Sequence, residues 1–350
     1  MMEFEIGERE IGEGHEPYIV AELSANHNGS IEKACEIIVA MADAGAHAVK
    51  LQTYTADTMT LDHTGEDFML QSGPWAGHNL YSLYQWAHTP WEWHEKLFET
   101  AKAAGLAAFS TPFDTTAVDF LEQFDPPAYK VASFEIVDIP LIEYVASKGR
   151  PMIMSTGMAS EEEIDQAVSA AREGGCEDLI LLHCTSGYPT PPEESDLLTI
   201  PHLAQRHQTL VGLSDHTMAS EVALSAIALG ACVVEKHVTM KREDGGPDAD
   251  FSLEPKELAA LVASTKVAWQ AMGSVRRSLR DAEKTQQPLR RSLYVVKDME
   301  IGEVFGPENV RSIRPGYGLA PKHLNEIFGQ VAKQRIARGT PLRWELVGER

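Results

Sequence analysis

The sequence is poor in basic residues and cysteine, and it has no long apolar run. Its 350 residues include 30 Lys and Arg against 52 Asp and Glu, a formal net charge of −22. A chain this acidic is a poor general binder of nucleic acid, although a local site can still hold an anionic small molecule. No stretch has the apolar length of a membrane span, and the first residues lack the apolar core of a signal peptide. We therefore expect a cytoplasmic protein with no nucleic-acid or membrane partner.

The four cysteines, Cys35, Cys176, Cys184 and Cys232, form no CxxC pair. In a cytoplasmic protein the default state of such thiols is reduced. Cys184 and Cys232 lie in apolar runs, so we expect them to be buried rather than reactive.

What the sequence does contain is a regular alternation of short apolar runs and amphipathic segments. The runs are almost continuously apolar, which is typical of parallel strands covered on both faces. Helix starts are indicated at Ser30, and at Ser160 with Glu163 three residues later. Eight such repeats in roughly 270 residues predict a (β/α)8 barrel. The expected strands are residues 18–23, 48–52, 106–111, 128–133, 151–156, 179–184, 209–214 and 232–237.

Two regions depart from this rhythm. The longest irregular stretch, Thr53 to Pro90, follows the second strand, where a long loop is expected to form a lid or wall of the catalytic face. After a barrel domain at residues 1–275 we expect a linker at 276–287 and a small module at 288–350. This module has eleven Lys and Arg against seven Asp and Glu, which favours docking onto the acidic barrel within a chain or across a dimer.

Every predicted strand ends in polar or ionisable residues. The active sites of (β/α)8 enzymes lie at the C-terminal ends of the strands, so these residues favour an enzyme over a binding protein. They are Glu22, Lys50, Gln52, Ser110, Lys130, Ser133, Ser155, His183, Tyr188, Asp215, His216, Glu235, Lys236 and His237.

His216 and His237 follow adjacent predicted strands and are placed to converge on one point. Two neutral imidazoles with few other protein ligands are typical of a catalytic metal site that keeps open positions. Asp215 and Glu235, next to them, would orient the two rings. The alternative is that each histidine only caps its strand through hydrogen bonds.

Lys50, Lys130 and Lys236 lie in or beside apolar strands, where a buried cation needs an anionic partner. With the serines that end neighbouring strands, they predict a cradle for a phosphate or carboxylate group. One alternative is internal ion pairing of these lysines with Glu22 and Glu235. Another is a Schiff-base aldolase with Lys130 as its nucleophile.

Several segments, in order along the chain, resemble the sialic acid synthase family, which condenses phosphoenolpyruvate with an N-acetylated sugar to make nonulosonic acids. They include "AELSANHNGSIEKA", "VKLQTYTADTMT", "FSTPFD", "STGMAS", "GLSDHT" and "EKHVT". The tail that contains "RRSLYVVKDMEIGEVFGPENVRSIRPGYGL" resembles the family's antifreeze-like (SAF) domain. "LYSLYQWAHTPWEWHEKLF" and "ASFEIVDIPLI" resemble the pseudaminic acid branch, whose sugar is 2,4-diacetamido-2,4,6-trideoxy-L-altrose. The N-acetylneuraminic and legionaminic acid branches are the alternatives.

The resemblance implies a TIM barrel with a C-terminal SAF domain and a role for each candidate residue. His216 and His237 would hold a divalent metal, typically Mn2+ with Mg2+ or Co2+ as alternatives, and Glu22 would stabilise positive charge at C2 of phosphoenolpyruvate. In a domain-swapped homodimer, Arg314 would reach the sugar site of the other subunit. Phosphoenolpyruvate would be bound by Lys50, Lys130, Ser133, Ser155 and Ser110, and the sugar by Gln52, Tyr188, Asp248 and Arg314.

Overall fold

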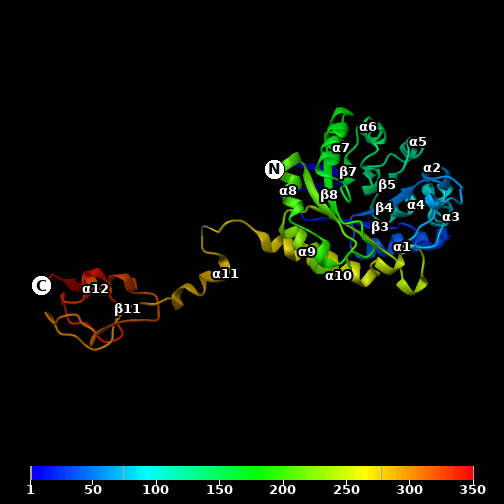
Figure 1. Cartoon of the computed structure of the whole chain (residues 1–350). Coiled ribbons are helices and arrows are strands. Elements are labelled where there is room, and N and C mark those ends of the chain that lie inside the picture. The colour runs from blue at the N-terminus through cyan, green and yellow to red at the C-terminus, as the bar shows by residue number, and fades with distance from the viewer. Residues whose placement is uncertain (1, 74, 277, 350) are drawn as a thin grey trace. The chain divides into compact units, whose positions relative to one another are not determined.

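Eight parallel strands close into a barrel, and helical connections join each strand to the next (Figure 1). The strands follow chain order around the barrel, and the last strand pairs with the first, Glu235 lying opposite Val20. This arrangement confirms the predicted (β/α)8 barrel. The computed structural model describes residues 2–73, 75–276 and 278–349. The barrel strands are β3 (Tyr18–Glu22), β4 (Ala48–Thr53), β5 (Ala107–Pro112), β6 (Tyr129–Val131), β7 (Met152–Ser155), β8 (Leu179–Cys184), β9 (Leu210–Ser214) and β10 (Val233–His237).

The helices that pack around the barrel begin where the sequence signals them. Ser30 accepts a hydrogen bond from the backbone N–H of Lys33 at 3.2 Å. Ser160 and Glu163 form a reciprocal capping box at the start of another helix. Such caps satisfy N–H groups that have no partner within the helix. The helices are α1 (Ile31–Asp43), α4 (His94–Ala103), α5 (Thr115–Leu121), α6 (Ile139–Ala146), α7 (Glu161–Glu173), α8 (Thr199–His207), α9 (Ser220–Ala228) and α10 (Pro255–Met272).

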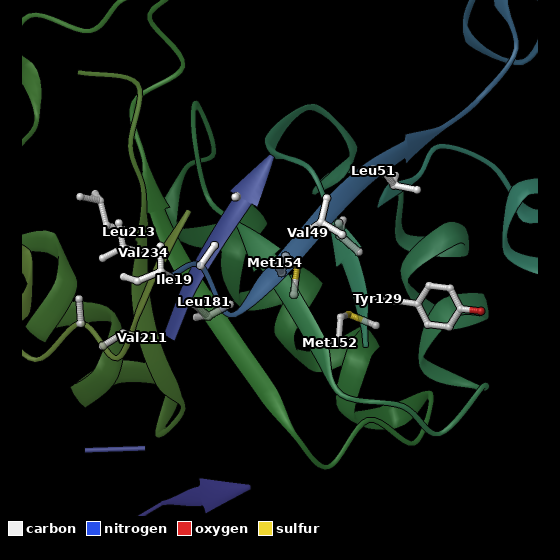
Figure 2. Close-up of a cluster of buried hydrophobic side chains, with 14 of the residues drawn as sticks. Ile19, Val49, Leu51, Tyr129, Met152, Met154, Leu181, Val211, Leu213 and Val234 are labelled. Atoms are coloured by element: carbon white, nitrogen blue, oxygen red, sulfur yellow. The ribbon is translucent and has the colours of Figure 1, made fainter. Parts of the chain in front are cut away.

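Alternate residues of each strand pack in two separate places. Ile19 and Leu181 belong to a large apolar cluster that the strands share with the surrounding helices (Figure 2). Their chain neighbours Val20 and Ile180 belong to a second cluster, which fills the inside of the barrel. Successive side chains of a strand point to opposite faces, so one strand can supply both cores. This two-sided burial explains why the strands read as continuous apolar runs.

A short N-terminal hairpin, which the sequence did not lead us to expect, closes one end of the barrel. It pairs β1 (Glu3–Ile6) with β2 (Arg9–Gly12). Ile6 and Ile11 are fully buried in the interior cluster beside Val20 and Phe109. The interior is therefore apolar at this end, and polar side chains are left to the opposite end, where the strands finish.

The connection after β4 is more ordered than expected. The sequence predicts an irregular stretch from Thr53 to Pro90, but the structure has α2 (Ala56–Met59) and α3 (Leu80–Ala87) there. Asn79 caps α3 by accepting hydrogen bonds from the backbone N–H groups of residues 81 and 82. A single-turn helix and a two-turn helix offer little periodicity for sequence analysis to detect.

A second compact unit, Ser274–Arg350, follows the first, Met1–Gly273. Its own apolar core includes Leu293, Phe305 and Leu342. Its elements are α11 (Asp281–Lys284), β11 (Ser292–Val295), β12 (Val310–Ile313), α12 (Leu324–Ile327), β13 (Val331–Ala332) and β14 (Val347–Gly348). In the described residues of either unit, no helix has the length and apolar character that a membrane crossing requires.

Candidate active site

The polar residues at the strand ends divide between the two faces of the barrel wall. The strand register places Glu22 opposite Lys50, and His237 opposite Glu22, on the face that also carries Val20. Because side chains alternate, every second residue from these positions points into the barrel. The inward set is Glu22, Lys50, Gln52, Thr111, Lys130, Ser155, Cys184, Ser214, Glu235 and His237, whereas Ser110, His183, Asp215 and Lys236 face outward.

Glu22 is the centre of a buried charged cluster. Its Oε2 lies 2.9 Å from Lys50 Nζ and 3.1 Å from His237 Nε2, and its Oε1 accepts a hydrogen bond from Gln52 at 2.8 Å. Burial alone would raise the pKa of Glu22, but His237 and Lys50 outweigh burial and hold this pKa well below its usual range. Lys50 also lies 3.0 Å from Glu235 Oε1. The internal ion pairing considered above is therefore real for Lys50, and a substrate anion must compete with two carboxylates for it.

Lys130, on β6, is buried with weaker charge compensation. Its Nζ donates hydrogen bonds to Ser155 Oγ at 2.7 Å and to the carbonyl oxygen of Val131 at 3.0 Å. The carboxylate of Glu235 is 3.8 Å away. Burial lowers the pKa of Lys130 to about 8, and Glu235 opposes part of this shift. An incompletely balanced cation of this kind is suited to hold an anionic group.

The hydroxyl that β5 directs into the barrel belongs to Thr111 and not to Ser110. Ser110 faces outward, where its Oγ is 2.6 Å from Thr53 Oγ1, which is itself 2.8 Å from His94 Nε2. Thr111 is 1% exposed, and its Oγ1 has no hydrogen-bond partner among the described residues. We therefore correct our expectation for Ser110. The Oγ of Ser133 accepts a hydrogen bond at 3.1 Å from the backbone N–H of Gly157, in the loop after β7.

His216 and His237 come together as expected, with ring centroids 5.3 Å apart. Burial and the nearby His237 lower the pKa of His216 to about 3, so its ring is neutral. The Nδ1 atom of His216 is 3.3 Å from the carbonyl oxygen of Thr185. We assign the ring proton to Nδ1, which leaves the Nε2 lone pair available.

The chemistry of this pair fits a divalent metal ion. Burial would lower the pKa of His237, but Glu22 outweighs burial and raises it, so a metal would compete with a proton that Glu22 favours on this ring. In the described part of the chain, no group of three or more His, Cys, Asp or Glu side chains is arranged to hold a metal. The two imidazoles would therefore be the main protein ligands and would leave positions open for substrate and water.

Asp215 and Glu235 are not where we expected them. Asp215 faces outward, 3.0 Å from Lys236 Nζ, and it accepts a hydrogen bond from the backbone N–H of Thr217 at 2.9 Å. Glu235 faces inward and accepts a hydrogen bond from Ser214 Oγ at 2.9 Å. Among the described residues, neither carboxylate bonds to a histidine ring. The expectation that they orient the rings is therefore corrected: Asp215 holds the turn that follows it, and Glu235 balances the lysines.

Gln52 and Asp248 belong to one hydrogen-bonded chain that begins at Glu22. The side-chain amide of Gln52 donates to Ser24 Oγ at 3.1 Å as well as to Glu22. The hydroxyl of Ser24 in turn donates to Asp248 Oδ2. Burial raises the pKa of Asp248, while His237 and Ser24 oppose this shift. Two residues predicted to bind the sugar are thus joined to the predicted catalytic carboxylate.

Tyr188 forms part of an aromatic wall beside the histidines. Its ring centroid lies 4.5 Å from that of His216 and 5.1 Å from that of Phe251. Phe251 in turn lies 5.1 Å from His237. A substrate held by the imidazoles would therefore meet apolar rings on this side.

Sequence reasoning missed several of the residues that belong to the inward-facing set or contact it. Thr111, Ser214 and Cys184 follow from counting alternate residues along a strand, once one inward residue is known. Ser24 and Phe251 lie in connections, where no periodic signal exists. Arg314 is exposed in the second unit, after β12, and its role stays a prediction.

Two family models match the chain, one for each compact unit. A model described as the NeuB family matches residues 37–277. A model of the SAF domain matches residues 290–348.

Individual proteins of known name are similar over almost the whole chain. Pseudaminic acid synthase of Campylobacter jejuni subsp. jejuni is 43% identical over 326 residues, which cover 93% of this chain and 95% of that protein. N,N'-diacetyllegionaminic acid synthase of Legionella pneumophila is 35% identical over 335 residues, 94% of each chain. The crystal structure of N-acetylneuraminic acid (sialic acid) synthetase from Leptospira borgpetersenii, in complex with citrate, is 31% identical. It superimposes with a TM-score of 0.73 and covers 81% of this chain and 95% of that one.

Proposed function

Because the chain belongs to the NeuB family, we propose that it is a pseudaminic acid synthase. It condenses phosphoenolpyruvate with 2,4-diacetamido-2,4,6-trideoxy-L-altrose and water, and it releases pseudaminic acid and phosphate. The observation that carries this proposal is the inward-facing cluster of lysines, hydroxyls and paired histidines in a chain so similar to a named pseudaminic acid synthase. The lower identity to the legionaminic acid synthase makes that activity the alternative.

The lysines would bind phosphoenolpyruvate through its carboxylate and phosphate groups. Lys50 and Lys130 contribute two inward-facing cations, and Ser155 and Thr111 add hydroxyl groups. The carboxylates of Glu22 and Glu235 match the two lysine charges in number, so the anionic groups of the substrate would have to take over the lysines from these carboxylates.

Carbon–carbon bond formation joins C3 of phosphoenolpyruvate to the aldehyde carbon of the open-chain sugar. Water then adds at C2, and the resulting tetrahedral centre expels phosphate with cleavage of its C–O bond. Glu22 is kept ionised by Lys50 and His237, so it is suited to stabilise the positive charge that develops at C2. Gln52, Tyr188 and Asp248 would contact the hydroxyl and acetamido groups of the sugar.

His216 and His237 would hold the divalent metal, which we propose to be Mn2+, with Mg2+ or Co2+ as alternatives. When bound, such an ion supplies Lewis-acid polarisation of the sugar aldehyde. The neutral ring of His216 is ready to bind it without losing a proton.

We further propose that the protein works as a domain-swapped homodimer in the cytoplasm. The basic SAF unit of one chain would place Arg314 at the sugar site of the acidic barrel of its partner. The four cysteines are free, which suits a reducing compartment.

The decisive test offers three sugars separately with phosphoenolpyruvate and Mn2+ and measures phosphate release. The sugars are the diacetamido-trideoxy-altrose, its mannose-type 2,4-diacetamido counterpart, and N-acetylmannosamine. Release with the altrose sugar alone supports the proposal. Release with another sugar alone moves the protein to a different branch, and release with none contradicts the synthase activity.

The pKa of Lys130 makes a prediction about pH. Lys130 binds the anionic substrate as a cation, and its pKa in the free enzyme is about 8. We therefore expect kcat/KM for phosphoenolpyruvate to fall about tenfold per pH unit above pH 8, because deprotonation removes the charge. The control is kcat/KM for the sugar at saturating phosphoenolpyruvate, which should fall less steeply. A flat profile of kcat/KM for phosphoenolpyruvate up to pH 9.5 would show that Lys130 is not the controlling group.

A borohydride test separates the proposed reaction from a Schiff-base aldolase. Borohydride in the presence of substrate should trap no adduct at Lys130, whereas a Schiff-base aldolase would be trapped.

A further inference from the structure

Trp75 lies at the tip of an excursion in the long connection after β4. Met69 pairs with Asn79 across this excursion, and the backbone N–H of Leu70 donates to the carbonyl oxygen of His78 at 3.0 Å. The tip reaches the catalytic end of the barrel, because the ring of Trp75 lies 5.5 Å from the ring of Tyr188. Trp75 therefore adds one more ring to the aromatic wall, on the side of Tyr188 that is away from the histidines.

The indole N–H of Trp75 is already used. It donates a hydrogen bond to the carbonyl oxygen of Pro247 at 2.8 Å. Pro247 directly precedes Asp248, the buried carboxyl group in the chain that leads to Glu22. This bond anchors the tip of the excursion to the segment that carries Asp248. It also leaves the indole with only an apolar face to offer a ligand.

We propose that Trp75 determines sugar specificity by packing against the apolar far end of the substrate. This inference rests on the proposed function, in which the aldehyde end of the sugar lies at His216 and His237. The far end of the proposed sugar carries a methyl group at C6 and an acetamido group at C4, both of which suit an apolar ring. A sugar with hydroxyl groups at these carbons would bury them against a face that provides no hydrogen-bond partner, which is costly.

The test compares Trp75→Ala and Trp75→Phe with the wild type. Trp75→Ala removes the apolar face, so we expect the KM for the altrose sugar to rise about 10- to 100-fold. The KM for phosphoenolpyruvate should stay within about twofold, because the contacts of Trp75 are with Tyr188 and Pro247 and not with the lysines. Selectivity for the altrose sugar over N-acetylmannosamine, measured as the ratio of kcat/KM values, should fall by a similar factor. Trp75→Phe keeps an apolar ring and should recover most of the selectivity.

Trp86→Ala is the matched control. Trp86 lies on α3 of the same connection, but it is 49% exposed and stacks on His78. Both KM values should stay at wild-type levels in this variant.

Unchanged sugar KM and selectivity in Trp75→Ala would overturn the inference and leave the proposed function standing. Equal loss for both substrates would also overturn it, because this result would indicate a general structural role. The wild-type sugar screen reports separately on the proposed function. If the wild type prefers N-acetylmannosamine, both the proposed branch and the apolar contact fail.

Discussion

Replacing His216 with alanine is expected to lower kcat about a thousandfold while the barrel stays folded. The substitution removes the neutral imidazole whose Nε2 lone pair is free for a metal. Loss of Lewis-acid polarisation of an aldehyde corresponds to about 4 kcal/mol of transition-state stabilisation, hence the thousandfold change. His216 is buried against the rings of Tyr188 and His237, so we expect the substitution to cost about 1–3 kcal/mol of stability and to leave the barrel folded. Phosphate release gives kcat, and urea unfolding gives the stability.

Metal binding should be measured independently of turnover. Calorimetric titration of the substrate-free protein with Mn2+ should show binding to the wild type and a loss of affinity of at least tenfold in His216→Ala and in His237→Ala. Turnover by the wild type in the presence of excess EDTA, or full Mn2+ affinity in both variants, would show that the histidines are not the ligands.

His183 offers a matched control for these substitutions. It is also a buried histidine at the end of a barrel strand, but it faces outward, and its Nε2 is 2.6 Å from the carbonyl oxygen of Ser195. Glutamine can keep that hydrogen bond. His183→Gln should therefore retain Mn2+ affinity and a kcat within a few-fold of the wild type.

The barrel could be predicted because burial on both faces leaves a strong signal. Each strand supplies residues to the helix-facing core and to the interior core, so it appears in the sequence as an apolar run with a polar end. The hairpin that closes the barrel lacked this signal. It buries Ile6 and Ile11 deeply but exposes Glu3 and Glu5, so it resembles a polar N-terminal segment.

The site could be predicted in outline, but not in the direction of each side chain. A polar strand end contains two adjacent candidates, and only one of them faces the barrel interior. Choosing Ser110 over Thr111 on β5 was such an error of one residue. The partners of the buried lysines are a second feature that the sequence could not predict. Lys50 meets carboxylates from β3 and β10, the first and last strands of the barrel, which barrel closure brings together.

A chain that ends at Gln287 is expected to fold its barrel and to lose at least about 99% of its turnover. The two units have separate apolar cores, so the truncation removes no described side chain from the barrel clusters. What it removes is the basic unit with Arg314, which we propose to complete the sugar site of the partner barrel. Thermal unfolding and Mn2+ titration should show an intact barrel, while phosphate release should fall to background. Full turnover by the truncated chain would contradict the proposed role of this unit.

Complementation can distinguish a swapped arrangement from one within a single chain. Full-length His216→Ala has a defective barrel but an intact C-terminal unit, whereas the truncated chain has the opposite combination. If the unit acts in trans, a mixed dimer has one functional site: the barrel of the truncated chain, which keeps both histidines, completed by the C-terminal unit of the full-length chain. Co-expression of the two inactive chains should then restore turnover. If the unit acts in cis, every barrel in the mixture lacks one component, and turnover should stay at background even when mixed dimers form. The same experiment with full-length Arg314→Ala in place of the truncated chain tests the guanidinium group alone. Recovery of turnover on co-expression with full-length His216→Ala would show that Arg314 acts on the barrel of the partner chain.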